Sequence, residues 1–177
     1  KKGIECEGIE PSDIAREKAI NNYKIKVNKN SDLKQYKEKE FDSISMWHVL
    51  EHVYDLNKTI TNLDRIINEK GTIVIAVPNY KSFDAEYYKE FWAAWDLPIH
   101  LNHFSEKTII NIFEKNNFKF IKKKGMIFDS FYVSLLSNEF KNGKKQYLKG
   151  FFIGLLSNIK ALLGNRGCSS NIYIFRS

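Results

Sequence analysis

Residues 41–79 constrain the fold of this 177-residue chain more than any other part of it. Two apolar stretches, at 41–53 and 71–79, flank a segment at 55–68 in which apolar side chains recur with helical spacing. The stretches read as strands that are apolar on both faces, which is typical of a parallel sheet covered by helices. The helix is long enough for the crossover, and Gly71 is placed to end it. These residues therefore predict a buried βαβ unit.

Strands and helices alternate along the rest of the chain. A helix at 14–21, with Ser12 or Asp13 as its N-cap, separates expected strands at 4–10 and 23–27. The expected downstream elements are a helix capped by Ser105 that runs to residue 116, a strand at 118–124, apolar helices at 128–140 and 146–163, and a final strand at 171–176. No repeat or linker divides the chain, so we expect one domain over 1–177, with 128–163 as a helical insertion or lid.

Composition limits the class of protein and its partners. Hydrophobic residues make up 43% of the chain, which excludes a disordered protein. The net charge is +7, but only four of the 28 basic residues are arginines, the residues that nucleic-acid readers use for forked contacts, so we expect no nucleic-acid partner. Cys6 and Cys168 are far apart and favour a reducing, cytoplasmic setting. The apolar stretch at 147–163 is too interrupted to span a bilayer.

Short landmarks in the chain carry a family resemblance. Leu-Glu-His-Val at 50–53, Lys-Gly at 70–71 and Val-Pro-Asn at 77–79 occur in this order, and the block resembles the second half of a class I S-adenosylmethionine (SAM) dependent methyltransferase. The Trp, Pro, His and His-Phe-Ser landmarks at 95–105 resemble a subgroup that modifies small molecules and glycans. The resemblance implies an α/β, doubly wound, Rossmann-like sheet, mostly parallel, with an antiparallel final strand beside 118–124. It also implies methyl transfer from SAM to oxygen or nitrogen of a small-molecule or glycan acceptor.

The family's first strand and its Gly-x-Gly-x-Gly turn have no counterpart in this sequence. The missing strand would lie between the strands that contain Ile4 and Phe41, and its turn lets the backbone approach the cofactor. The chain also starts with Lys1 rather than Met, so we expect a fragment, a processed product or a trimmed chain whose complete form has an N-terminal segment. Alone, it is expected to bind SAM poorly or not at all. The rival hypothesis is a non-catalytic remnant that serves as a binding or scaffold domain.

Candidate cofactor residues follow the first expected strands. Glu10 is an acid at the carboxyl end of a strand, where a carboxylate can accept both hydroxyls of a ribose, although a solvated strand-end charge is the alternative. Glu10-Pro11-Ser12 resembles the family's second motif, which adds Ser12 to the cofactor set. Asp32 follows the next strand, where the family often places an acid beside adenine, and an ordinary loop carboxylate is the alternative.

The segment Met46-Trp47-His48 ends the central strand, where α/β folds open their ligand crevice. An aromatic ring or a thioether suits an adenosine there, so all three residues are cofactor candidates, while core packing is the alternative for Met46.

His48-x-x-Glu51-His52 also matches the inverted zinc-protease spelling H-x-x-E-H. A zinc hydrolase would place both histidines on a long helix, whereas here they follow a strand, so this is a distant alternative. Quinone-pathway O-methyltransferases resemble the block and hold a divalent cation with an acid-x-x-Glu-His group, in which His48 would replace the acid and favour a transition metal. Hydrogen bonding by Glu51 and His52 to the structure or the substrate is the favoured role, so we predict no metal.

The remaining candidates are His100 and His103, in the segment that the resemblance places over the active-site mouth. A histidine there could deprotonate an acceptor hydroxyl or amine, so His52, His100 and His103 are the predicted catalytic residues. The alternative is that His100 and His103 hold the loop through backbone hydrogen bonds.

The basic, apolar region 128–163 has four interpretations: core packing against the sheet, which is favoured, a cover over a greasy substrate, a dimer face, or a peripheral membrane contact.

Overall fold

The computed structural model describes residues 3–164 and 166–177, which form two compact units, one within 1–37 and one over 38–177. The first unit contains β1 (Glu7–Ile9), α1 (Asp13–Tyr23), β2 (Lys26–Asn28) and a short 3-10 helix (Leu33–Gln35). β1 and β2 pair in parallel, and α1 provides the crossover connection that such a pair needs. The Ser12 hydroxyl accepts the Ala15 N–H at 3.4 Å, which confirms Ser12 as the N-cap of α1.

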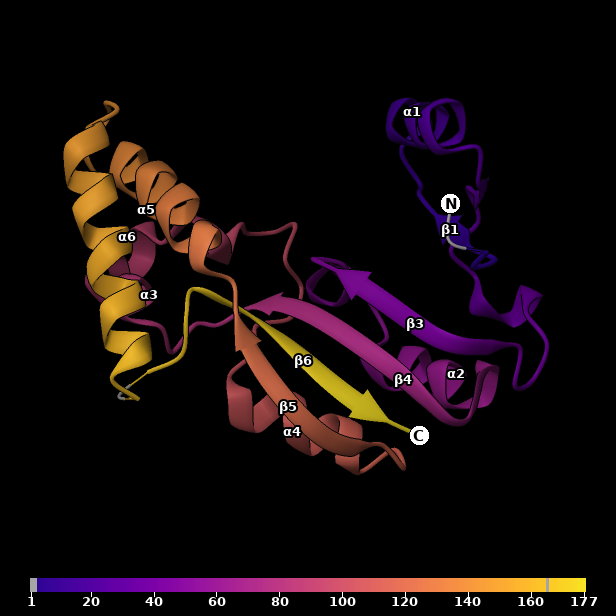
Figure 1. Ribbon diagram of the computed structural model, residues 1–177. Helices are drawn as coiled ribbons and strands as arrows, with labels where there is room; N and C mark the ends of the chain where they lie inside the picture. The colour runs from indigo at the N-terminus through magenta and orange to yellow at the C-terminus, as the bar shows by residue number, and fades with distance from the viewer. Residues whose placement is uncertain (1–2, 165) are drawn as a thin grey trace. The chain divides into compact units, whose positions relative to one another are not determined.

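The second unit is built on a four-stranded sheet (Figure 1). Its strands are β3 (Phe41–Trp47), β4 (Ile67–Pro78), β5 (Lys119–Gly125) and β6 (Ser170–Arg176), in the spatial order β3-β4-β6-β5. β3 and β4 are parallel, while β6 is antiparallel to both β4 and β5. Three strands therefore share one direction, and the predicted antiparallel final strand lies beside 118–124 as expected. The predicted α/β, Rossmann-like, mostly parallel fold is confirmed.

Helices cover the sheet and build its core. They are α2 (Leu56–Ile66), α3 (Phe83–Tyr88), α4 (Glu106–Glu114), α5 (Ile127–Asn142) and α6 (Tyr147–Leu162), with 3-10 turns at Leu50–His52, Lys89–Phe91 and Ala93–Trp95. Ser105 caps α4, as predicted. Leu63 of α2 and Phe113 of α4 are buried, and the Phe113 ring stacks on Phe175 of β6 with centroids 4.4 Å apart. The described helices include none with the length and apolarity needed to cross a bilayer.

Two expectations for the βαβ unit were wrong. None of the seven residues of β3 is fully buried, because β3 is an edge strand of its sheet, whereas β4 is mostly buried. Gly71 does not end α2, which stops at Ile66, but lies within an irregular start of β4. A Cβ on Gly71 would come within 2.6 Å of Ile67 Cγ1 and 2.8 Å of the Asn68 carbonyl oxygen. Close backbone approach therefore requires the glycine.

The predicted insertion at 128–163 is a helical hairpin, formed by α5 and α6, that connects β5 to β6 along the chain (Figure 1). Its role as a lid remains a prediction.

Candidate functional site

A cleft of about 300 Å³ opens in the second unit where β3 and β4 end. His48 follows β3, Pro78 ends β4 and Ser170 begins the antiparallel β6, so all three line the cleft from one end of the sheet. Asp129 lines it from α5, and His100 lines it from the segment between β4 and α4. Ligands of open α/β sheets bind at this end, so the cleft is the candidate site.

His48 lies between two carboxylates. Its Nδ1 is 3.1 Å from Glu51 Oε1, and its Nε2 is 3.4 Å from Asp129 Oδ2. The carboxylates of Asp129 and Glu51 raise the pKa of His48 from 6.5 to about 9, against the opposing effect of burial. At neutral pH His48 is therefore a cation that joins the end of β3 to the first turn of α5.

The backbone at His48 is unusual, because its φ of 51° lies in the left-handed region that side chains rarely adopt. The His48 N–H donates to the Ala76 carbonyl of β4 at 3.0 Å, which continues the sheet pairing one residue past β3. The chain then turns into the 3-10 helix that carries Glu51 and His52. The turn prevents His48 and His52 from sharing one α-helix, so the arrangement that a zinc hydrolase needs does not form.

Asp129 was missed by sequence reasoning. Burial raises its pKa, but His48 and the nearby Ser170 hydroxyl outweigh this, so the net pKa is lowered and the group is an anion at neutral pH. The signal available in the sequence was an isolated acid in the first turn of an apolar helix. The contact with His48 spans 81 positions along the chain, and no local pattern predicts it.

Glu51, the other carboxylate beside His48, is buried, with 1% of its surface exposed. Its backbone carbonyl accepts the N–H groups of Leu101 and Asn102, at 2.8 and 3.0 Å, which fixes the loop that carries His100. Among the residues that the structure describes, its Oε2 has no hydrogen-bond partner.

The loop brings His100 against Glu51 and His52. One ligand atom from each of the three residues lies within 4.8 Å of the other two, and the two rings meet edge to face with centroids 4.7 Å apart. The nitrogens around tetrahedral zinc are about 3.4 Å apart, so the three groups could hold a transition metal only after moving closer together. This trio contains His100 in place of the expected His48.

The predicted catalytic histidines have different surroundings. His100 Nδ1 donates to the Ala94 carbonyl at 2.8 Å, and its Nε2 is 3.9 Å from Asp96 Oδ2. His52 Nδ1 donates to the Ile99 carbonyl at 3.3 Å. His103 Nε2 donates to the Trp95 carbonyl at 3.0 Å. Each of the three histidines therefore makes a hydrogen bond to a backbone carbonyl, as a purely structural role would require. Of the three, only His100 also lines the cleft.

The predicted cofactor residues in the first unit make local contacts. Glu10 Oε1 accepts the Ser12 N–H at 2.8 Å, and the Ser12 hydroxyl is engaged as the helix cap. Asp32 caps the 3-10 helix by accepting the Lys34 N–H at 3.0 Å. In the second unit Met46 is half-buried and Trp47 is 52% exposed. Their roles toward SAM, like that of His48, remain predictions.

Comparisons with known proteins identify the family. The family model for a methyltransferase domain matches residues 1–123. A SAM-dependent methyltransferase from Archaeoglobus fulgidus is similar in structure, with a TM-score of 0.63 at 17% identity, over 99% of this chain and 77% of that one. Phosphoethanolamine N-methyltransferase 2 from Haemonchus contortus, solved with S-adenosyl-L-methionine, has a TM-score of 0.59 at 16% identity, over 99% of this chain and 44% of that one. A search of curated proteins gave no match.

The cyclopropane synthase MmaA2 from Mycobacterium tuberculosis is also similar, with a TM-score of 0.61 at 11% identity, over 97% of this chain and 69% of that one. At such identities a structural likeness establishes the fold alone. The family match extends over more than half of the sequence and includes both the cofactor candidates and the His100 loop. The chain belongs to the methyltransferase domain family, whose general chemistry is SAM-dependent methyl transfer.

Proposed function

We propose that the protein transfers a methyl group from SAM to a hydroxyl or amine of a small-molecule or glycan acceptor, in the cytoplasm and without a nucleic-acid partner. The observation that carries this proposal is the cleft at the carboxyl ends of β3 and β4, with a histidine on its wall. Bound SAM supplies an electrophilic methyl group on a sulfonium. The protein has to align the acceptor and take up one proton.

His100 is the proposed base. Its Nδ1 donates to the Ala94 carbonyl, so in the neutral tautomer the lone pair is on Nε2. When Nε2 takes the proton that the acceptor loses, Asp96 Oδ2 at 3.9 Å stabilises the resulting imidazolium. His52 packs on His100 at 4.7 Å between ring centroids and His103 at 6.3 Å, so we assign these two the role of holding the His100 ring.

His48 is unsuited to accept a proton at neutral pH, because its two carboxylate neighbours keep it protonated. Its proposed role is to hold α5 at the edge of the cleft through Asp129. For the cofactor, Glu10 fits a ribose, because one carboxylate oxygen is held by the Ser12 N–H at the end of a strand while the group remains partly exposed. Asp32, Met46 and Trp47 are proposed to contact the adenosine.

The first test is calorimetric titration with S-adenosylhomocysteine, in this chain and in a protein extended by the expected N-terminal segment. Micromolar binding by the extended protein supports the proposal. Failure of a folded extended protein to bind would favour the non-catalytic remnant, the second candidate, which the use of Ser12 and Asp32 as local helix caps favours.

The second test measures transfer from labelled SAM to a panel of alcohols, amines and sugars. For an accepted substrate, His100→Ala should lower kcat about 100-fold or more with little change in S-adenosylhomocysteine binding. The matched control is Lys107→Ala on the exposed side of α4, which should leave kcat unchanged. An unaltered kcat in His100→Ala would remove His100 from the mechanism.

A further inference from the structure

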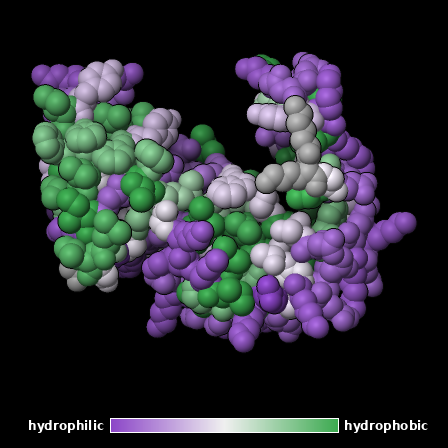
Figure 2. Space-filling model, viewed as in Figure 1, coloured by the Kyte–Doolittle hydropathy of each residue, from purple (hydrophilic) through white to green (hydrophobic). Residues whose placement is uncertain are grey.

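Helix α6 presents its apolar side chains to solvent. Its buried positions are Gly150, Ile153, Gly154, Ser157 and Asn158, and all of them except Ile153 are small or polar. Its other large apolar residues are on the opposite face and are 37% to 81% exposed. This outer face of α6 includes Leu148, Phe152, Leu155, Leu156, Ile159 and Leu162. Figure 2 shows a mostly green surface over the helical hairpin.

Close approach to α5 explains why the small residues face inward. A Cβ on Gly154 would be 2.8 Å from the Ser130 carbonyl oxygen and 2.9 Å from Phe131 Cα. A Cβ on Gly150 would be 2.8 Å from Leu135 Cδ2. Small residues at four-residue spacing bring helices together in this way inside membranes, where apolar burial cannot drive association. The contact between α5 and α6 therefore does not use the outer face.

Buried hydrogen bonds fix the rotation of α6. The Ser157 hydroxyl donates to Asp84 Oδ1 at 2.6 Å, and Asn158 Oδ1 accepts from the Ser130 hydroxyl at 2.8 Å. Asn158 Nδ2 also donates to the Ile127 carbonyl at 2.9 Å. Turning the outer face inward would break all three bonds in a water-excluded place, so the apolar face is held outward.

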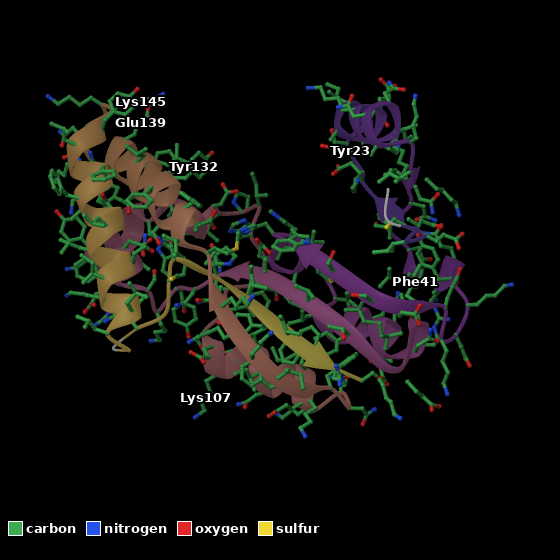
Figure 3. The ribbon with its side chains drawn as sticks, viewed as in Figure 1. Tyr23, Phe41, Lys107, Tyr132, Glu139 and Lys145 are labelled. Atoms are coloured by element: carbon green, nitrogen blue, oxygen red, sulfur yellow. The ribbon has the colours of Figure 1, made fainter. Side chains whose placement is uncertain are left out.

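Positive charge is concentrated in and just before α6, where two of the lysines, Lys141 and Lys160, lie over the rings of Tyr87 and Phe83. Residues 140–163 contain lysines at 141, 144, 145, 149 and 160 and no acidic residue. Glu139, just before this stretch, is 4.0 Å from Lys145, and Figure 3 shows the two together at the end of the hairpin remote from the sheet. A second copy of the hairpin would carry the same net positive charge, which disfavours a dimer through the same face.

We propose that the outer face of α6 binds an anionic membrane surface, with the helix lying in the plane of the interface. Its apolar side chains enter the boundary between head groups and acyl chains, and the lysines meet anionic head groups. The 16 residues of α6 extend about 24 Å, which suits an in-plane helix. The association is peripheral, since no described helix can cross the bilayer.

Flotation with sonicated vesicles tests this proposal on the full chain. Vesicles of 70% phosphatidylcholine and 30% phosphatidylglycerol should carry the protein, and pure phosphatidylcholine should carry at least tenfold less. The double variant Phe152→Ser/Leu156→Ser should lower the partition coefficient at least tenfold, and Lys144→Glu/Lys145→Glu should abolish the preference for anionic lipid. The matched control Leu97→Ser/Ile121→Ser removes exposed apolar residues elsewhere and should bind as the parent does.

Because these side chains are exposed, the variants should keep the parent's circular dichroism spectrum and urea midpoint. Three outcomes overturn the proposal: no binding by the parent to anionic vesicles, equal loss in the control variant, or equal binding to neutral and anionic vesicles. A dimer by sedimentation velocity that Phe152→Ser/Leu156→Ser dissociates, without vesicle binding, would instead assign the face to a second copy.

Discussion

Helices α2 and α6 are both amphipathic, yet α2 packs its apolar face against the protein and α6 packs the face that carries mostly small and polar residues. In α2 the apolar residues Ile60, Leu63 and Ile66 are at most 2% exposed. In α6 the buried side includes Gly154 and Ser157, and every large apolar residue except Ile153 is at least 37% exposed. Removal of apolar surface from water orients α2, whereas backbone proximity and buried hydrogen bonds orient α6. An apolar stripe thus defines two faces of a helix without deciding which one packs.

The largest effect is expected at Asp84, which attaches α6 to the rest of the unit. This fully buried carboxylate accepts hydrogen bonds from Trp92 Nε1 at 2.8 Å and from the hydroxyls of Ser157 and Ser169, both at 2.6 Å. Asp84→Ala leaves three buried donors without an acceptor and should lower the free energy of unfolding by about 3 to 5 kcal/mol, measured by urea denaturation. Asp84→Asn keeps one acceptor and should lose less. Near-parent stability of Asp84→Ala would show that polar contacts do not orient α6.

The comparison is tested directly by one substitution made in both helices. Leu63→Ala removes a side chain that is 1% exposed and should lower the free energy of unfolding by about 3 kcal/mol. Leu162→Ala removes one that is 81% exposed and should change it by less than about 0.5 kcal/mol. Urea midpoints of the two variants measure the difference. Equal losses would mean that the outer face of α6 is packed in solution.

A smaller effect is expected at Gly154. Alanine is the better helix former by about 1 kcal/mol, but its methyl group would meet the Ser130 carbonyl oxygen at 2.8 Å. Gly154→Ala should therefore lower stability by about 1 to 2 kcal/mol, which thermal unfolding can measure. A gain in stability would show that α5 and α6 can move apart, and that their close approach does not determine which face of α6 packs on α5.

The smallest effect concerns the ion pair that holds α5, the support of α6. The pKa of His48 is raised from 6.5 to about 9 in the folded state, so its stabilising effect is complete below about pH 6.5 and is lost as pH rises through 9. After allowance for solvent screening, the loss between pH 6.5 and 9.5 should be about 1 kcal/mol. Urea denaturation at both pH values should give this loss in the parent and a smaller one in His48→Gln. If the stability of the parent and of His48→Gln depended on pH in the same way, the ion pair of His48 would not contribute to holding α5.

The sequence predicted those elements whose pattern and environment agree. Helix α2 follows from periodicity and strand β4 from an apolar stretch, Ser12 and Ser105 follow from capping chemistry, and the antiparallel β6 follows from the family resemblance. The aromatic segment 81–102, for which the sequence predicts no helix or strand, contains α3 and two 3-10 turns. Its order depends on long-range contacts such as that between Trp92 and Asp84, which no local pattern encodes.

The candidate site was predicted residue by residue but not as an arrangement. His48, Glu51, His52 and His100 were all identified in the sequence, but the contact of His48 with Asp129 and the proximity of His100 to Glu51 arise from loops that close over tens of residues. The sequence predicted an apolar, basic helix at 146–163 but not which of its faces packs. The observation that could have given its orientation was Gly150 and Gly154 at four-residue spacing on the side opposite the leucines.

The place of β6 between β4 and β5 has a consequence for the order of folding. In the sheet register, Phe175 pairs with Ile73 on one side and Phe120 on the other, so the neighbours of β6 are about 100 and 55 positions upstream. During synthesis β4 and β5 have no shared partner until residues 170–176 have been made. The sheet is therefore completed late, by contacts of high sequence separation, and its nascent strand edges need protection from association until then.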